Sequence, residues 1–167
     1  MDLQILYHFT QKESVMVDQA QQNITINAQY VKALQFSNDN APRSLMNLTE
    51  APQVNIAVDV KANKFSDEVY EVALAIKAEA NAKDLKCFTC DLTYCGLVTL
   101  KGIAANQLQA VLLVECPRLL FPFARSIIAD ITREGGYAPL LVHPIDFLGL
   151  YQQQMKSGGL QAAPTKQ

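Results

Sequence analysis

Tyr70-Glu71-Val72-Ala73-Leu74-Ala75-Ile76-Lys77-Ala78-Glu79 is the stretch of sequence that decides the fold. Its even-numbered residues are all apolar, whereas Glu71, Lys77 and Glu79 stand among the odd-numbered ones. Side chains of a β-strand point alternately to the two faces of a sheet, so this period of two is typical of a half-buried strand. The stretch therefore predicts a strand in a sheet with one apolar and one polar face.

Three further segments carry the same alternation: Val54 to Val60, Phe88 to Tyr94, and the even positions from Ile24 to Phe36, with Ala28 and Tyr30 among them. Lys32 interrupts the last pattern and predicts a β-bulge or an edge position. Gly96 predicts a bend after the fourth strand. The connections are short and contain no helical pattern, which favours antiparallel pairing.

The chain turns helical after the last strand, from about Ala104 to Glu134, and Gly135-Gly136 ends the pattern. Pro117 and Pro122 lie inside it and predict a kink or break near Cys116-Pro117. A short final helix is expected with Pro144 in its first turn and Asp146 near its positive end, running to about Met155. The fold class is α+β: a four-stranded antiparallel sheet with a long, kinked or broken helix and a short C-terminal helix packed on one face.

The chain has 167 residues, of which 50% are hydrophobic, enough for one domain but too few for two. We expect a flexible N-terminal extension over 1–22, a folded domain over 23–156 and a flexible tail over 157–167. Translation starts at Met1 or at Met16. The first residues lack the cationic start and apolar core of a secretory signal, and no apolar run approaches the ~20 residues of a membrane span, so we expect a cytoplasmic location and no direct membrane insertion.

The net charge of −2, without a run of Lys or Arg, predicts no nucleic-acid partner. No nucleotide-binding or metalloprotease motif occurs, and the only histidines are His8 and His143. A capping or packing role is expected for His143. The sequence thus predicts a protein that is not an enzyme and needs no cofactor.

Cysteine spacing offers one chemical alternative. Cys87 and Cys90 stand in a C-x-x-C pattern, with Cys95 and Cys116 further on, and thiolates at such spacing bind zinc or exchange disulfides. On a strand, however, residues 87 and 90 point to opposite faces. We expect four free thiols and no metal, with a zinc or thiol protein as the remote alternative.

The long helix carries apolar residues most of the way round. A helix of this kind needs cover on more than one side, and in a chain this small the extra cover implies another subunit. The candidates for the subunit interface are Val111, Leu112 and Leu119.

The segment Cys116-Pro117-Arg118-Leu119-Leu120-Phe121-Pro122-Phe123-Ala124-Arg125 resembles the Cys-Pro-x-x-Leu-Phe-Pro-Tyr-Ala-Arg segment of the SecB family of protein-export chaperones. The likeness continues in Asp67 to Val72 and in Ala138 to Phe147, and it covers about Ile24 to Met155. It implies an ATP-independent chaperone that binds unfolded preproteins, keeps them competent for translocation and delivers them to SecA. It also implies a homotetramer, built as a dimer of dimers with the long helix between the dimers.

The family binds its clients along apolar grooves. The residues expected to line the groove are aromatic or aliphatic and stand near the sheet edge, the long helix and the final helix: Phe88, Leu97, Phe121, Phe123, Tyr137, Phe147, Leu148 and Tyr151. Taken singly, each of them is more often a core residue, because most large apolar side chains are buried.

SecA docking in the family uses acidic residues on the polar face of the sheet. Asp91 matches one of them, whereas Ala33 and Ser37 occupy two positions that are often acidic. Asp39, Asp59 and Glu71 are candidates to compensate. These departures keep an alternative open, a SecB-like chaperone dedicated to one client such as an antitoxin, with weak or no coupling to SecA.

Overall fold

The computed structural model describes residues 23–46, 51–83 and 85–157. Met16, the extension over 1–22 and nearly all of the tail over 157–167 lie outside these ranges, so those expectations stay predictions. The elements are β1 (Asn23–Ser37), α1 (Arg43–Met46), β2 (Gln53–Ser66), β3 (Val69–Ala82), β4 (Leu85–Lys101), α2 (Ala105–Ala110), η1 (Val111–Glu115), α3 (Cys116–Glu134) and α4 (Phe147–Lys156).

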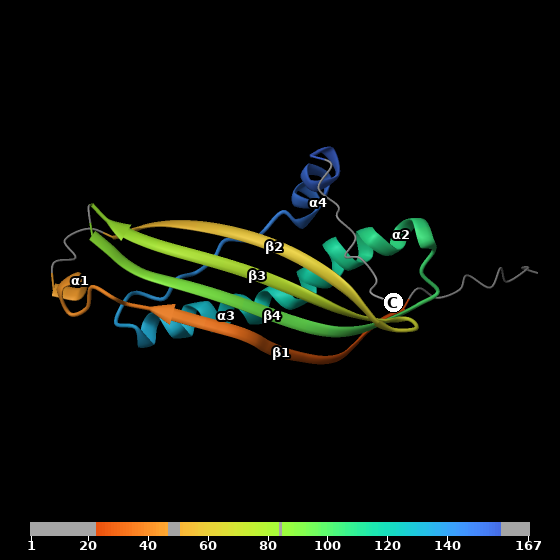
Figure 1. Ribbon diagram of the computed structural model, residues 1–167, viewed down its shortest axis with the longest axis horizontal. Coiled ribbons are helices and arrows are strands. Elements are labelled where there is room, and N and C mark those ends of the chain that lie inside the picture. The colour runs from red at the N-terminus through yellow and green to blue at the C-terminus, as the bar shows by residue number, and fades with distance from the viewer. Residues whose placement is uncertain (1–22, 47–50, 84, 158–167) are drawn as a thin grey trace, which may run out of the picture.

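The four strands form one antiparallel sheet in the order β1-β4-β3-β2. The predicted α+β fold class is confirmed: Figure 1 shows α3 running behind the sheet, α4 projecting past β2 and the short α1 at one end of the sheet. β1 and β2 are the two edges. β2 and β3 extend beyond the alternating residues that predicted them. A tight turn at Asp67-Glu68 joins the two strands, so their pairing continues to Ser66. Glu68 adopts a left-handed φ of 60° in this turn.

One face of the sheet, here called the helical face, carries the core. The even-numbered residues of β3 and, from Phe88 on, of β4 point to it, and Val72, Leu74, Ile76 and Leu92 are almost completely buried. The opposite face, here called the open face, carries the odd-numbered residues of β3 and, from Thr89 on, of β4. The alternation around Leu74 thus separates the two faces as the sequence predicts.

β1 departs from its predicted faces. Its pairing with β4 shifts between Ile26 and Ala28 and again between Val31 and Ala33, so Asn27 and Lys32 are each an extra residue. The bulge at Lys32 was predicted and the bulge at Asn27 was not. Each bulge exchanges the faces, and the register therefore turns Ala28 and Tyr30 to the open face; the prediction that they join the apolar face is wrong.

Gly96 is not a bend, because β4 continues through it to Lys101 and pairs it with Gln29 and Val72. Its role is close packing. A Cβ atom at this position would lie 2.8 Å from Leu120 Cδ2, so the missing side chain lets α3 approach the centre of the sheet.

The irregularity predicted at Cys116-Pro117 is a π-helical stretch. α2, η1 and α3 follow one another without a loop, and within η1 the Cys116 N–H donates to Val111 O, five residues back. Pro117 has no N–H and clashes with the turn before it in a regular α-helix. The wider π-turn accommodates the ring at the start of α3, and α3 continues across Pro122.

The segment after α3 returns along the helical face before α4 begins. Thr132, fully buried, accepts a hydrogen bond from Leu140 N at 2.9 Å, and Val142 is buried further on. α4 starts at Phe147, so Pro144 precedes it instead of lying in its first turn as expected. Asp146 is the N-cap and accepts from Gly149 N at 3.0 Å, because the first N–H groups of a helix lack partners inside it. In the described ranges, no helix combines the length and apolarity needed to cross a membrane.

Gly96→Ala should lower the free energy of unfolding by about 1–3 kcal/mol, the usual cost of overpacking, because the added methyl group must displace Leu120. Chemical denaturation at fixed protein concentration measures the change. In a Leu120→Ala background the same substitution should cost almost nothing. An equal cost in both backgrounds would show that Gly96 serves the strand and not the helix contact.

Candidate functional site

The residues predicted to line a client groove fall into separate environments. Phe88, Phe121, Tyr137 and Phe147 are buried, Tyr151 is partly buried, and Phe123 and Leu148 are 50% and 44% exposed. Leu97 is partly buried and pairs with Ala28 and Glu71 on the open face. The eight residues therefore do not form one surface in this conformation.

Tyr137 belongs to a buried polar cluster at one end of the sheet. Its hydroxyl lies 2.8 Å from Ser44 Oγ, donates to Asn38 Oδ1 at 2.8 Å and lies 3.0 Å from the carbonyl oxygen of Cys87. Its ring packs against Phe88, with the centroids 4.9 Å apart. These contacts attach α1 and the end of α3 to the start of β4, so Tyr137 and Phe88 hold the fold together.

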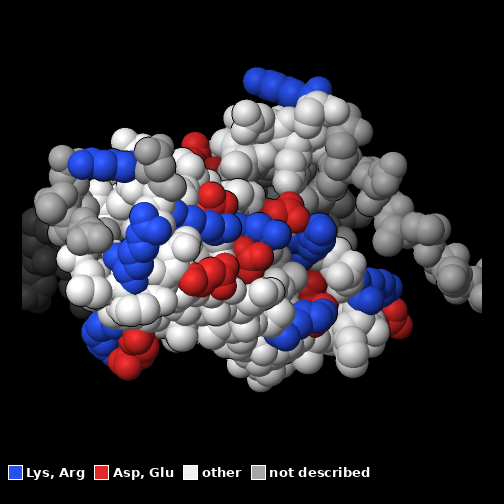
Figure 2. All heavy atoms as spheres, turned by 60° about the vertical axis from the view of Figure 1, so that its left-hand side comes forward, with Lys and Arg blue, Asp and Glu red and all other residues white. Residues whose placement is uncertain are grey.

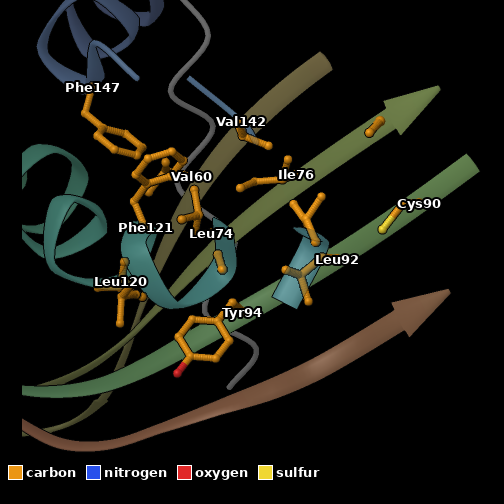
Figure 3. Close-up of a cluster of buried hydrophobic side chains, with 14 of the residues drawn as sticks. Val60, Leu74, Ile76, Cys90, Leu92, Tyr94, Leu120, Phe121, Val142 and Phe147 are labelled. Atoms are coloured by element: carbon orange, nitrogen blue, oxygen red, sulfur yellow. The ribbon is translucent and has the colours of Figure 1, made fainter. Parts of the chain in front are cut away.

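Phe121 and Phe147 attach α4 to the rest of the domain. The rings meet edge to face, with their centroids 6.1 Å apart, and Figure 3 shows Phe147 reaching down from α4 toward Phe121, with Val60 and Leu74 beside them. Phe147 is the only residue of α4 that is fully buried. The contact between these two rings therefore holds α4 against α3 and the sheet.

Four large apolar side chains are exposed on α4, on the segment before it and on β2, and are called here together the α4 surface: Leu148, Met155, Leu141 and Ile56. Figure 1 shows α4 projecting past the β2 edge of the sheet. Of these four residues, the sequence predicts only Leu148 for a binding groove. Leu141 lies in an irregular segment without periodicity, and the alternation around Ile56 gives its face of the sheet but not whether a helix covers it.

A second apolar surface lies beside the β1 edge and is called here the α3–β1 surface. Leu119 and Phe123 stand one turn apart on α3, and the Phe123 ring packs on Tyr94 with the centroids 6.3 Å apart. Tyr94 is the register partner of Val31, which is also exposed. Leu34 extends the exposed patch along β1. An apolar patch of this kind on a small domain marks an interaction surface.

The three predicted interface residues lie at different depths. Leu119 is exposed on the α3–β1 surface, whereas Leu112 is buried in the core and Val111 is partly buried. Burial of Leu112 by its own chain leaves it little surface to offer a second copy.

Asp91 lies on the open face, as predicted. It pairs across the strands with Lys77, the carboxylate and ammonium groups being 3.5 Å apart. The register puts Ala33 and Ser37 within two residues of Gln35, the β1 partner of Asp91. Ala33 and Ser37, at the positions that are often acidic in the family, therefore lie in the same region of this face as Asp91.

Glu71, another candidate acid, is held in a network on the open face. It accepts from the Tyr30 hydroxyl and forms an ion pair with Lys32 at 2.8 Å. The bonds from Lys32 and Tyr30 lower the pKa of Glu71, and the bond to the carboxylate raises the pKa of Tyr30 to about 12. The bulge at Lys32 places its ammonium group over this site.

The cysteines are free and buried. Burial raises the pKa of Cys90 and of Cys116 to about 11 and raises that of Cys95, so these thiols stay protonated at neutral pH. Zinc binding and thiol chemistry both require the thiolate. Among the described residues, no group of three or more His, Cys, Asp or Glu side chains is placed to hold a metal ion.

A sheet with one helical and one open face, carrying two exposed apolar surfaces, is the architecture of a protein that offers apolar surface to other polypeptides. The family model "Preprotein translocase subunit SecB" matches residues 17–158, and the chain belongs to the SecB family.

Relatives with the name protein-export protein SecB match most of the chain. The protein from Parvibaculum lavamentivorans is 49% identical, over 83% of this chain and 82% of its own length. The protein from Acidiphilium cryptum is 48% identical, over 77% of this chain and 87% of its own. The predicted family is therefore confirmed.

Among solved structures, a SecB-like chaperone from Mycobacterium tuberculosis, in complex with a peptide from an antitoxin, is similar with a TM-score of 0.62. The match covers 73% of this chain and 90% of the M. tuberculosis chain, with 14% sequence identity. At this identity the likeness supports the fold alone.

Tyr137→Phe should lower the free energy of unfolding by about 1–3 kcal/mol, because buried polar groups of Ser44, Asn38 and Cys87 lose a partner. Client holding below the melting transition should be unchanged. Denaturation and an aggregation-suppression assay measure the two effects. Loss of client holding in a fully folded variant would show that Tyr137 belongs to the client-binding surface.

Proposed function

We propose that this chain is a protein-export chaperone that binds unfolded preproteins without ATP and keeps them competent for translocation. The observation that carries the proposal is the 49% identity, over most of both chains, with a protein-export protein SecB. The exposed apolar side chains of the α4 surface support it, since an unfolded chain offers apolar segments in need of cover. The proposal assigns no catalytic step to any residue.

Client binding of this kind needs only hydrophobic burial. Covering about 1,000 Å² of apolar surface at about 25 cal/mol per Å² contributes up to ~25 kcal/mol before the cost of ordering a flexible client is subtracted. Most of that gain is offset by the ordering, so the complex stays reversible. In this conformation the client would meet Leu148, Leu141 and Met155 first, with Phe121 and Phe147 beneath them.

We further propose that the chain works in the cytoplasm as a homotetramer and delivers its clients to SecA. The α3–β1 surface supports assembly, because Leu119 and Phe123 lie exposed on the helix that the SecB resemblance places between dimers. Asp91 on the open face is the candidate contact for SecA. The open face and the apolar surfaces are distinct, so one molecule could engage a client and the motor together.

The alternative of a chaperone dedicated to an antitoxin has less support. The M. tuberculosis protein solved with an antitoxin peptide shares 14% identity with this chain, far less than the export proteins do. The thiol alternative is disfavoured by the raised pKa values of Cys90, Cys95 and Cys116.

Leu148→Glu should weaken binding of an unfolded preprotein about tenfold or more, because a charge replaces a side chain whose burial is worth ~1.5–3 kcal/mol. Light scattering coupled to size exclusion, with and without the preprotein, measures the complex. Phe65→Glu is the matched control, since Phe65 is 73% exposed near the β2–β3 turn, outside the α4 surface. Equal losses from both substitutions would contradict the α4 assignment.

Leu119→Glu should reduce the assembly below a tetramer, because it places a carboxylate in the apolar α3–β1 surface. The molar mass from light scattering measures the change, and circular dichroism checks that the subunit stays folded. The Leu148→Glu variant should keep the wild-type mass. A folded, tetrameric Leu119→Glu protein would remove this surface from the interface.

A further inference from the structure

An apolar segment precedes the SecB-like domain and is called here the N-terminal segment: Leu3-Gln4-Ile5-Leu6-Tyr7-His8-Phe9. It lies outside the described ranges and ahead of residue 17, where the match to the family model begins. Its odd-numbered residues are all aliphatic or aromatic, with Gln4 and His8 between them. An extended conformation would turn these four side chains to one side, so that they form an apolar edge about 20 Å long.

The N-terminal segment matches the α4 surface in chemistry. It contains no Lys, Arg, Asp or Glu, and α4 has no charged residue before Lys156 in its last turn. Figure 2 shows the lobe that α4 forms at the top of the molecule, with few atoms of charged residues on it. Leu148 and Met155 are 44% and 52% exposed there. Contact between the two would remove apolar surface from water on both sides and bury no charge.

The tether between the segment and the sheet is long enough for this contact. β1 begins at Asn23, and residues 10–23 reach at most about 46–50 Å when fully extended. α4 is attached beside Leu74 of β3 (Figure 3), which lies level with Val31 of β1. Val31 is about 26 Å from Asn23 along the strand, and three strand spacings to the β2 edge add about 14 Å across the sheet. The tether therefore exceeds the distance that it must span.

A tether of this length brings the segment to an effective concentration in the millimolar range. A segment with a Kd of about 0.1 mM would then occupy the α4 surface about nine-tenths of the time at ~1 mM effective concentration. A client has to displace it, so the apparent affinity for the client falls roughly tenfold. Weak binding by the segment is thus enough to set a threshold on client affinity.

We infer that the N-terminal segment binds the α4 surface of its own chain and competes there with unfolded clients. The inference rests on the proposed function, since it takes the α4 surface as the client site. The α3–β1 surface is the other apolar surface near the start of the chain, but the proposed assembly covers it. The segment shields Leu148 and Met155 from water between clients and excludes clients that bind too weakly to displace it.

The full-length double variant Tyr7→Ser with Phe9→Ser tests the competition. It should tighten binding of an unfolded preprotein about tenfold, because the segment loses both aromatic side chains and with them most of its affinity. Gln4→Ser with His8→Ser is the matched control, since it changes two residues of the same segment and keeps its apolar edge. Fluorescence anisotropy of a labelled preprotein measures binding, and circular dichroism checks the fold.

A photo-crosslink locates the segment. With p-benzoylphenylalanine in place of Tyr7, irradiation without client should join position 7 to α4, and mass spectrometry identifies the residue. The product should run as a single chain on a denaturing gel, and Leu148→Glu should reduce its yield about tenfold or more.

Four results would overturn the inference: unchanged client binding by the Tyr7/Phe9 variant, equal tightening by its control, a crosslink to the α3–β1 surface, or a crosslink to a second copy. An intact mass of the natively expressed protein that lacks residues 1–15 would overturn it as well.

The two measurements separate the inference from the proposed function. If the wild type and the Tyr7/Phe9 variant both hold no unfolded preprotein, the proposed function fails, and the crosslink made without client still shows where the segment binds. If both hold a preprotein with equal affinity, the inference is overturned and the chaperone activity stands.

Discussion

The close approach of α3 to the centre of the sheet is the contact on which the rest of the structure depends. It requires a strand position without a side chain, which Gly96 provides, and a large side chain to enter it, which Leu120 provides. It also requires a helix that runs past Pro117 without a loop, and the π-turn of η1 meets this need. Together these features let one continuous helical segment bury the centre of the helical face.

A single helix cannot cover a sheet of four long strands, and the uncovered margins are where the apolar surfaces lie. On the β1 side, Phe123 and Leu119 stay exposed beside Tyr94. On the β2 side, α4 is attached through Phe147 and leaves Leu148 and Met155 uncovered. Incomplete cover is a cost for a monomer and a means of binding for a chaperone, because each margin presents apolar surface in water.

The two faces of the sheet separate two kinds of recognition. The margins of the helical face present apolar surface, and binding by burial of such surface tolerates many client sequences. The open face carries ordered charges held at fixed register by the strands, and such charges discriminate between partners more than they add affinity. The bulge that brings Lys32 over Glu71 contributes to this order without disturbing the core beneath it.

The sequence by itself determined the four strands, the antiparallel class, the helix with an irregularity at Cys116-Pro117, a short final helix with Asp146 near its N-terminus, and the SecB family. These depend on local periodicity, proline chemistry and a specific motif, all of which are readable along the chain. Only the tertiary structure decided the faces of Ala28 and Tyr30, because a second bulge at Asn27 leaves the local alternation unchanged. It alone also decided that Tyr137 is buried while Leu148 is exposed, since burial depends on neighbours distant in sequence and not on residue type.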